Sequence, residues 1–456
     1  MTRANPAAAF SGAEIVPTSA PVPVAVAVPA RRIALLNVKY SPNLGDGLLS
    51  ECLEAELALS FAVMAPHTTV FSIDLAGRRA YPAIAPSHRA RMIALLEALP
   101  SGLRRLATRL ALAALVRLRL RQHVRTQLAG CDAVVLGGGN LLTDADLNFP
   151  MKIAGALRQA ARLHLPVAVY GVGANRNWSD EGRRLFGRAL GQAWLAYAAV
   201  RDERSQAAWR DLLVPQGVMP AALSGDPGLL ASCHFARSPA PFDGPLAGLC
   251  VTAPMALRYH ATGPAAPETG PEATLETAPE TGPETAPEVL DAWYGDAACA
   301  LVSAGFRVAL FTNGSPEDRD YLETMGPIWI ARAKGPVTMT GPSANPAEMI
   351  SFITCCGLIV AHRMHACIAA HSFAIPTIGL RWDVKLDSFF ALAGRNEYIA
   401  DAAALDGPAL TALARRAARE GVDKPALDRL ISNTRADIAV MAAALAGAMR
   451  PVAQAA

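Results

Sequence analysis

Residues 358–385 read LIVAHRMHACIAAHSFAIPTIGLRWDVK, and this stretch decides how the rest of the chain is interpreted. Its two short apolar runs predict buried strands, and the alanine-rich segment between them predicts a helix. His362, Arg363 and His365 stand between the first strand and this helix. Cations at the carboxyl end of a strand and the amino end of a helix favour an anionic ligand, such as a phosphate or a carboxylate.

Similar apolar runs recur along the chain, and most are followed by glycine or polar residues and then by a helical pattern. The predicted strands are 32–38, 70–73, 131–136, 165–170, 198–200, 249–252, 307–311, 358–361 and 375–380. Alternating strands and helices are typical of parallel βαβ units, whose ligands sit beyond the carboxyl ends of the strands. The pattern restarts after Pro241. The sequence therefore predicts an α/β fold with two Rossmann-like domains facing a common cleft, their parallel sheets flanked by helices.

The predicted domain organisation divides the 456 residues into four parts. Residues 1–30 are expected to be a disordered tail, 31–240 an N-terminal domain, 241–405 a C-terminal domain, and 406–456 helices that pack across the back. Within the second domain, residues 263–288 repeat glutamate every fourth residue with prolines between them. Because proline prevents a continuous helix and bulky side chains are rare, this segment is predicted to be a disordered acidic insertion.

Composition limits the classes of function. Hydrophobic residues make up 52% of the chain and charged residues 18%, as expected of a globular protein. A net charge of +3 is too small to indicate nucleic acid as a bulk partner. The eight cysteines include no CxxC pair and favour reduced thiols. No apolar run reaches the length of a membrane span or of a secretory signal, so a cytoplasmic location is expected.

Residues 102–127 carry seven arginines and no acidic residue. On a helical wheel these arginines spread widely, whereas a membrane-surface helix segregates its charges on one face. The pattern favours an ordinary exposed helix. Contact with anionic lipid or a lipid-linked substrate is the alternative.

Two glycine-containing motifs follow predicted strands of the first domain. After the first strand comes Asn43-Leu-Gly-Asp46, in which Asp46 is either the cap of the next helix or a base for a substrate hydroxyl. A later strand leads into Gly137-Gly138-Gly139-Asn140, where the glycines allow a ligand to approach the backbone and Asn140 is a polar wall residue. This is not the GxGxxG spacing, so a nicotinamide cofactor is disfavoured and no cofactor is expected.

Charged residues elsewhere have competing interpretations. Arg201-Asp202 follows a predicted strand and forms either a local salt bridge or part of an anion site. His371 lies inside the helix of the opening stretch and is interpreted as a packing residue. No HxxxH or HExxH pair occurs, so no metal site is expected.

With these landmarks in order, the chain resembles the polysaccharide pyruvyl transferase family. The motifs that carry the resemblance are Asn43-Leu-Gly-Asp46, Val134-Val-Leu-Gly-Gly-Gly139, Pro166-Val-Ala-Val-Tyr-Gly-Val-Gly173, Val200-Arg-Asp-Glu-Arg-Ser205, Ser224-Gly-Asp-Pro227, Arg363-Met-His365-Ala366, Ile375-Pro376 and Trp382-Asp-Val-Lys385. They extend from about Arg32 to Ile399, leaving out the tail, the acidic insertion and the C-terminal helices.

The resemblance implies a fold like that of GT-B glycosyltransferases. It also implies transfer of the pyruvate moiety of phosphoenolpyruvate onto two sugar hydroxyls as a cyclic ketal, with the acceptor on the first domain and phosphoenolpyruvate on the second. Arg363 and His365 are implicated in binding and activating phosphoenolpyruvate, and Arg201, by position, in donor binding. One departure is visible, because the family commonly has serine where this chain has His362.

The chemistry of this donor agrees with these residue types. Its phosphate and carboxylate suit two arginines, and its methylene carbon must gain a proton to become the methyl group of the ketal. His365 is the candidate general acid or else the proton donor to the departing phosphate. Either Lys385 or Arg363 is assigned to the departing phosphate, and Asp46 to a hydroxyl proton; the roles of Lys385 and Asp46 rest on position alone. The remaining substrate-binding candidates are Asn43, Gly138, Gly139, Asn140 and His362.

The expected partners are phosphoenolpyruvate and a sugar acceptor of cell-surface polysaccharide assembly. This acceptor is lipid-linked, nucleotide-linked or polymeric, and the lipid-linked case accords with peripheral contact at the inner membrane. Two rival functions are a GT-B glycosyltransferase that uses a nucleotide sugar, and a catalytically silent relative that acts as a binding protein. The presence of Arg363 and His365 argues against the silent relative.

Overall fold

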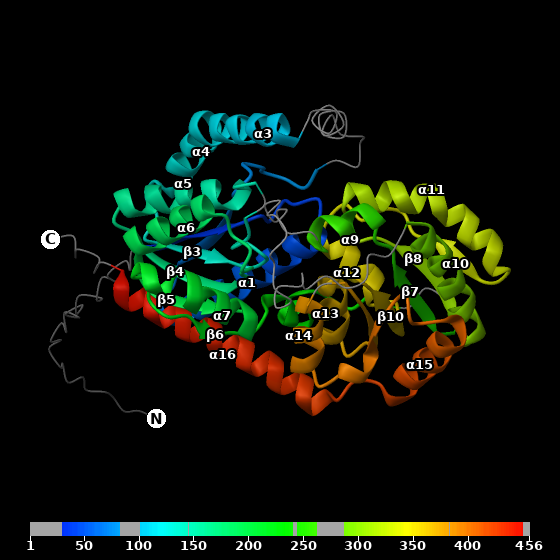
Figure 1. Ribbon diagram of the computed structural model, residues 1–456. Helices are drawn as coiled ribbons and strands as arrows, with labels where there is room; N and C mark the ends of the chain where they lie inside the picture. Colours follow the sequence, from blue (N-terminus) through cyan, green and yellow to red (C-terminus); the bar gives the residue numbers. More distant parts are fainter. Residues whose placement is uncertain are drawn as a thin grey trace, which may run out of the picture.

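The computed structural model describes residues 30–82, 101–144, 146–239, 244–261, 287–382 and 384–449. Within these residues the named strands form two six-stranded sheets (Figure 1). Residues 1–29 of the predicted tail and most of the predicted acidic insertion, 263–288, lie outside the described residues.

The first sheet has the strand order β2-β1-β3-β4-β5-β6, and all its neighbouring strands are parallel. Its strands are β1 (Arg32–Asn37), β2 (Thr69–Asp74), β3 (Ala133–Gly137), β4 (Pro166–Val172), β5 (Trp194–Val200) and β6 (Ala222–Leu223). Because β2 and β3 lie on opposite sides of β1, the chain reverses its direction across the sheet between β1 and β3. Such a switch point is where open α/β sheets bind ligands.

The second sheet has the order β12-β11-β10-β7-β8-β9 and is also parallel. Its strands are β7 (Leu246–Cys250), β8 (Arg307–Phe311), β9 (Val337–Met339), β10 (Leu358–Ala361), β11 (Thr377–Arg381) and β12 (Ile399–Asp401). Its switch point lies between β7 and β10, directly before the segment that holds His362, Arg363 and His365.

Helices cover both faces of the sheets (Figure 1). They are α1 (Leu44–Met64), α3 (Ser101–Leu115), α4 (Arg121–Leu128), α5 (Asn148–Arg162), α6 (Asp180–Gln192), α7 (Glu203–Leu212), α8 (Ala231–His234), α9 (Pro254–Ala261), α10 (Pro287–Ser303), α11 (Pro316–Ala333), α12 (Pro346–Ile353), α13 (Met364–Ser372), α14 (Val384–Leu392), α15 (Gly407–Glu420) and α16 (Lys424–Ala448). A π-helical turn, η1 (Val116–Leu120), joins α3 to α4, and 3₁₀ turns are η2 (Val214–Gln216), η3 (Pro227–Leu230) and η4 (Asn396–Tyr398).

Side chains alternate between the two faces along each strand, and this explains why helices cover both faces of the sheets. In β1, Ile33 and Leu35 pack in a core with residues of α1, whereas Ala34 and Leu36 pack in a second core with residues of α5. Successive side chains of a strand point to opposite faces, so a strand that is apolar throughout is buried on both sides. The core on the α1 side continues into the second domain through η3 and α13.

The predicted fold class is confirmed, because both sheets are parallel and flanked by helices. Helix α1 begins at Leu44, directly after Asn43. The side chain of Asn43 caps the helix by accepting a hydrogen bond from the Gly45 N–H at 3.2 Å. The interpretation of Asp46 as the cap is therefore wrong, and Asp46 lies in the first turn of α1.

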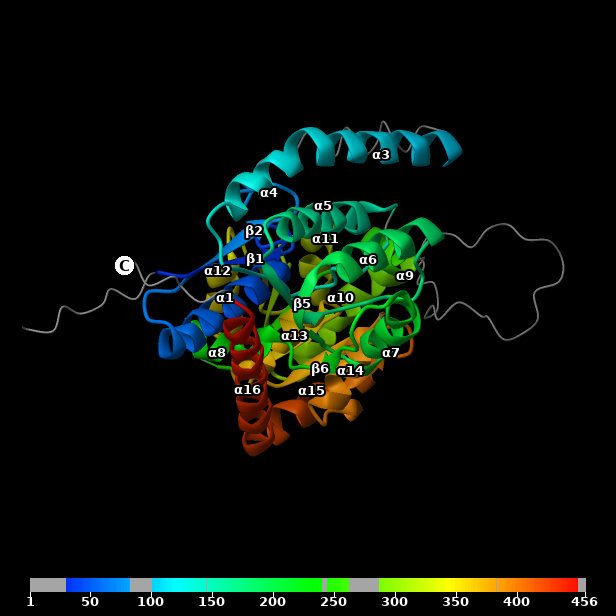
Figure 2. The ribbon, with the colours of Figure 1, turned by 90° about the vertical axis from the view of Figure 1, so that its left-hand side faces the viewer.

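Two helical segments extend beyond the βαβ units. Helix α16 returns to the first domain, where Arg435 pairs with Glu56 of α1 at 2.9 Å and Tyr170 of β4 donates to the Thr434 carbonyl at 3.2 Å. Helix α3 stands away from the body of the first domain (Figure 2). Within the described ranges, no helix is both long enough and apolar enough to cross a membrane.

Candidate functional site

The carboxyl ends of the two sheets meet where the first turn of α1 contacts the loop after β8. The Asn313 side-chain amide donates a hydrogen bond to Asn43 Oδ1 at 2.7 Å, and the Leu44 N–H donates to the Asn313 carbonyl at 2.8 Å. Asn43 therefore caps α1 and joins the two domains at the same time. This contact brings the switch points of both sheets together.

Gly45 packs directly against His365, the candidate acid from the second domain. A methyl group added at Gly45 would lie 2.6 Å from His365 Nδ1 and 2.7 Å from His365 Cβ. Real Cβ atoms do not approach other atoms this closely, so only glycine allows the two domains to meet here.

We expect Gly45→Ala to lower kcat by at least about tenfold while the protein stays folded, because the methyl group must displace the His365 ring and misplacement by 1 Å is costly in an active site. Alanine is also the better helix former, so the helix itself loses nothing. Steady-state kinetics and a thermal melt test this. In the control, Gly341→Ala, the new methyl group meets no atom within 4 Å, and both properties should stay at the parental values. Unchanged kcat in Gly45→Ala would contradict the close packing.

His365 lies in the first turn of α13 and is neutral in this environment. Burial lowers the pKa of His365 to about 3, and the positive charges of Arg201, Lys385 and Arg363 add to the effect. Its Nε2 atom is buried and makes no hydrogen bond to any described residue. The ring thus packs at Nδ1 against Gly45, and its Nε2 has no hydrogen-bond partner among the described residues.

Asp46 lies beside the glycines that follow β3. Gly138 and Gly139 have φ angles of 77° and 79°, which glycine adopts without strain. A methyl group at Gly139 would lie 3.6 Å from Asp46 Oδ1. Burial raises the pKa of Asp46 to about 6, although a hydrogen bond with Ser41 opposes this. The charges of Arg78, Arg363 and Arg201 also oppose it, which places Asp46 near the cations of both domains.

Arg201 and Asn140 converge above Gly173, at the carboxyl ends of β5, β3 and β4. A methyl group at Gly173 would lie 2.7 Å from both Arg201 Nη2 and Asn140 Oδ1. Arg201 is only 4% exposed and donates from Nε to Asp202 Oδ2 at 3.3 Å. Its Nη1 is 3.9 Å from Asp226 Oδ2, which is too long for a hydrogen bond. Arg201 Nη1 and Asn140 Oδ1 are both buried and make no hydrogen bond within the described residues.

Arg363 forms a buried ion pair that sequence reasoning missed. Its Nε and Nη2 atoms donate to Asp318 Oδ2 at 2.9 and 2.5 Å, and the Asp318 side chain is fully buried. The other carboxylate oxygen of Asp318 accepts a hydrogen bond from the Ala253 N–H at 2.8 Å. Two of the three guanidinium nitrogens of Arg363 are therefore engaged within the second domain. These two bonds fix the orientation of the guanidinium group.

His362 contacts the interior of the second domain. It is 1% exposed, and its Nδ1 lies 3.1 Å from the Tyr294 hydroxyl. Its carbonyl accepts a hydrogen bond from the Trp382 indole. Burial lowers the pKa of His362 to about 3. Its ring packs against Trp293 and Tyr294 of α10.

The structure thus brings together most of the residues that the sequence singled out. Arg201, Lys385 and Arg363 all lower the pKa of His365, and two of these cations, Arg201 and Arg363, also act on the pKa of Asp46. Burial lowers the pKa of His371 to about 4, and its ring packs on Phe389, as expected of a packing residue.

Sequence reasoning missed Asn313, Asp318 and Asp226. Asp226 lies in a motif that had been noticed, whereas Asp318 is an ordinary first-turn acid of α11 and gave no signal. In the part of the chain that the structure describes, no group of three or more His, Cys, Asp or Glu side chains could hold a metal.

Comparisons with known proteins bear on the family and the fold. A family model described as polysaccharide pyruvyl transferase matches residues 43–384. A search of curated proteins gives no match. Solved structures with similar folds include the UDP-GlcNAc 2-epimerase from Methanocaldococcus jannaschii (TM-score 0.49, 11% identity, 90% of this chain and 98% of that chain covered). Others are the sucrose-phosphate synthase from Thermosynechococcus elongatus (0.44, 11%, 91% and 98%) and a mutant O-GlcNAc transferase from Thermobaculum terrenum (0.38, 15%, 92% and 67%).

The family match and the geometry of the site agree with each other. The matched residues begin at Asn43 and end at Val384, so they include the first turn of α1, the glycines after β3, Arg201, Arg363 and His365. They also include Asn140, whose buried side-chain oxygen has no hydrogen-bond partner among the described residues. This chain belongs to the polysaccharide pyruvyl transferase family.

Proposed function

We propose that this protein transfers the pyruvate moiety of phosphoenolpyruvate onto two hydroxyls of a sugar in a cell-surface polysaccharide or its precursor. The product is a cyclic pyruvate ketal, and inorganic phosphate is released. Phosphoenolpyruvate and the sugar acceptor are the only reactants that this chemistry requires, so no cofactor is proposed.

One observation carries this proposal. Arg201 Nη1, Asn140 Oδ1 and His365 Nε2 are buried at the junction of the domains without a hydrogen-bond partner among the described residues. Buried polar groups that lack partners are rare, and each calls for an explanation. A small ligand with a phosphate and a carboxylate supplies acceptors for the two nitrogen donors, beside the cations of Arg363 and Lys385. A sugar hydroxyl can donate to Asn140 Oδ1.

The residues can be assigned to steps that balance. His365 protonates the methylene carbon, which becomes the methyl group and leaves cationic character on the adjacent carbon. One sugar hydroxyl attacks that carbon and gives its proton to Asp46. The phosphate then departs, stabilised by Lys385 and Arg201, and the second hydroxyl closes the ring. Two protons leave the hydroxyls, one ends in the methyl group and one on the released phosphate.

The test is incubation of the full chain with phosphoenolpyruvate and a panel of sugar acceptors. We expect phosphate release only with a suitable acceptor, together with an acceptor mass raised by the pyruvyl group. Phosphate release without any acceptor, or no turnover on any acceptor, would count against the proposal. Saturable binding of a nucleotide sugar with transfer of its glycosyl group would indicate the rival glycosyltransferase function.

If Asp46 is the base, kcat/KM should decrease on the acidic side, or acidic limb, of its pH profile. Burial raises the pKa of Asp46 to about 6, so the carboxylate is largely ionised at neutral pH and becomes protonated as the pH falls through this value. We expect kcat/KM to fall about tenfold per pH unit below the pKa, as for any essential single base. Asp46→Asn should have a low rate without this limb. A limb that persists in Asp46→Asn would assign the titration to another group, such as the phosphate of the donor.

A further inference from the structure

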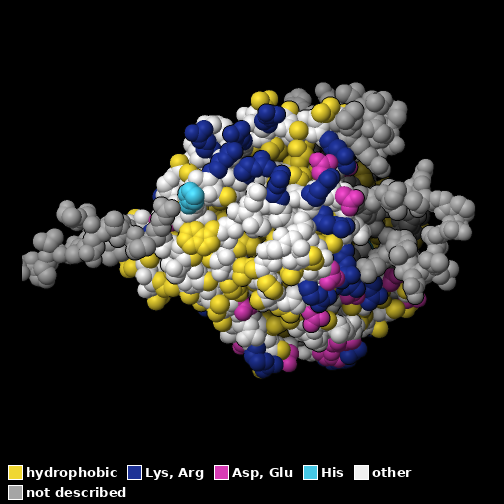
Figure 3. Space-filling view, turned by 60° about the vertical axis from the view of Figure 1, so that its left-hand side comes forward, with side chains coloured by type: hydrophobic (Ala, Val, Ile, Leu, Met, Phe, Trp, Pro, Cys, Tyr) yellow, Lys and Arg dark blue, Asp and Glu magenta, His cyan; other side chains and the backbone are white. Residues whose placement is uncertain are grey.

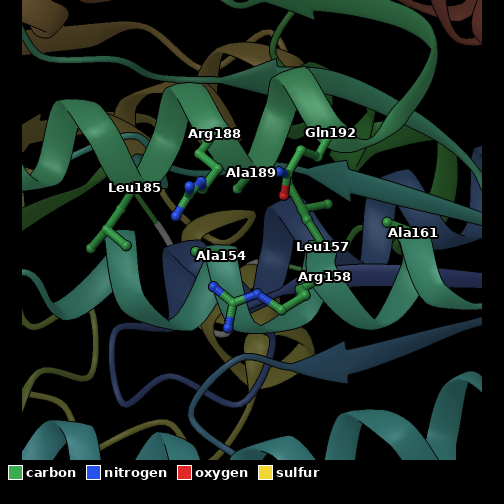
Figure 4. Close-up of a pocket in the computed structure, with 8 residues that line it drawn as sticks. All are labelled: Ala154, Leu157, Arg158, Ala161, Leu185, Arg188, Ala189 and Gln192. Atoms are coloured by element: carbon green, nitrogen blue, oxygen red, sulfur yellow. The ribbon is translucent and has the colours of Figure 1, made fainter.

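A second candidate site lies in the first domain. The loop after β2, residues 76–80, and the helical segment of η1 and α4 enclose a groove of about 820 Å³. Volumes of this order are typical of sites for small molecules. By contrast, the groove between α5 and α6 that Arg158 and Arg188 overhang measures about 10 Å³ and holds a single water at most (Figure 4).

The large groove is lined by cations and contains no described carboxylate. Arg78, Arg79 and Arg119 line it, together with neutral polar side chains of α4. Arg79 and Arg119 are exposed, and neither pairs with a carboxylate that the structure describes. His123 also lines the groove, and its buried Nε2 makes no hydrogen bond to any described residue. The groove therefore offers fixed positive charge and an unused imidazole nitrogen to a ligand.

The loop that lines the groove continues to a contact with α1, the helix that carries Asp46. Its loop leads into Tyr81, whose hydroxyl would be 2.7 Å from a methyl group added at Gly47 and donates to Glu51 at 2.6 Å. Arg78 is bound to Asp74 at 3.2 Å, and its charge opposes the raised pKa of Asp46. Arg78 therefore both lines the groove and acts electrostatically on the proposed base.

We propose that this groove binds the diphosphate that links the acceptor sugar to its carrier. This assignment rests on the proposed transfer function. Arginine binds phosphate oxygens through paired, charge-assisted hydrogen bonds, and several arginines match the charge of a diphosphate better than that of a neutral polymer. The sugar at the end of the diphosphate then reaches Asp46. No Trp, Tyr or Phe among the described lining residues is available to stack on a nucleobase.

The surface around the groove suits a diphosphate that is attached to an apolar carrier. Leu118 is 78% exposed at the rim of the groove, where it can contact an apolar chain. Exposed arginines continue over the adjacent helices, and Figure 3 shows Lys and Arg side chains gathered over the upper part of this face. The arginines next to the groove are Arg117, Arg121 and Arg125 in η1 and α4.

The test measures binding of two soluble probes, geranyl diphosphate and UDP, to the full chain by calorimetry with phosphoenolpyruvate present in excess. Geranyl monophosphate and UMP are the matched single-phosphate probes. We expect Arg79→Gln/Arg119→Gln to weaken diphosphate binding by at least about tenfold, since each lost hydrogen bond to a charged group is worth this much. The control, Arg158→Gln/Arg188→Gln, removes the same charge from the same face and should change the affinity less than about twofold.

The two probes distinguish the carriers. Binding of geranyl diphosphate but not of UDP supports a lipid-linked acceptor, and binding of UDP supports a nucleotide-linked one. The proposal is overturned if neither diphosphate binds, if the groove variant binds as tightly as the parent, or if the control loses affinity equally. Phosphoenolpyruvate affinity is measured in parallel and should be unchanged in the groove variant. If the proposed transfer function is wrong, the parent protein will instead fail to bind or consume phosphoenolpyruvate.

Discussion

His365→Gln is expected to lower kcat by about two to four orders of magnitude, which is the usual contribution of a general acid. Glutamine keeps an amide near the position of the imidazole but cannot donate a proton to carbon. Because the cations of Arg201, Lys385 and Arg363 remain, phosphoenolpyruvate should still bind, with a dissociation constant within about threefold of the parental value. The measurements are steady-state kinetics and equilibrium binding of phosphoenolpyruvate.

The low pKa of His365 in the free protein, together with its role as an acid, predicts that a proton is taken up when phosphoenolpyruvate binds. Burial and three neighbouring cations lower the pKa of His365 to about 3, so the free protein carries it neutral at every physiological pH. An acid must hold its proton before it can give it. The charges of phosphoenolpyruvate offset the cations, which raises the pKa of the histidine in the complex. Calorimetry in buffers with different ionisation enthalpies should therefore show uptake of up to one proton by the parent and less by His365→Gln.

A control on the same helix separates this role from general damage. His371 is also buried in α13, but its ring packs on Phe389 and its charge environment is set by Arg395. His371→Gln is expected to change stability without the loss of kcat or of proton uptake. A parental rate in His365→Gln would show that another group protonates the methylene carbon.

The strands of the fold were predictable where apolar runs are buried on both faces. Residues 307–311 and 358–361 were predicted as strands and are strands in the structure, because continuous apolar sequence suits the middle of a parallel sheet. The edge strands β6, β9 and β12 were missed. They span two or three residues and are partly exposed, so their sequence carries no such run.

The candidate site was predictable where its residues follow strands, and unpredictable where it depends on contacts between distant elements. Asp46 and His365 stand next to motifs that the sequence displays. The packing of Gly45 on His365 joins positions that only the docking of two domains brings together. Pairing of Arg363 with Asp318 likewise connects residues 45 positions apart, and no local pattern records it. His362 follows the same strand as Arg363, yet its ring faces Tyr294.

The Asp318 pair raises the question of what Arg363 does. A guanidinium held by two hydrogen bonds inside a domain can serve mainly to stabilise the second domain, or it can position Nη1 for the donor. Truncating one partner of a buried ion pair leaves a charge buried without compensation, which typically costs about 3–5 kcal/mol. Arg363→Met is therefore expected to lower the free energy of unfolding by this amount as well as to abolish transfer.

The double variant Arg363→Met/Asp318→Asn separates the two roles. Asparagine is neutral and its oxygen still accepts the hydrogen bond that Asp318 receives from the Ala253 N–H. We expect the double variant to recover at least about half of the lost stability, because no uncompensated charge remains buried. If Arg363 also binds phosphoenolpyruvate, the stable double variant remains inactive and binds the donor weakly. Denaturant unfolding, donor binding and turnover are measured on the same preparations.

An exposed pair provides the matched control. Arg176 and Asp211 lie 2.6 Å apart with their side chains 60% and 41% exposed, and Arg176→Met should cost about 1 kcal/mol or less. Parental stability in Arg363→Met would show that the buried pair is not structural. Full activity in the folded double variant would remove Arg363 from the donor site and leave Arg201 and Lys385 to hold phosphoenolpyruvate. Inactivity with restored stability is the result that assigns Arg363 both roles, since a purely structural arginine is dispensable once its partner is neutral.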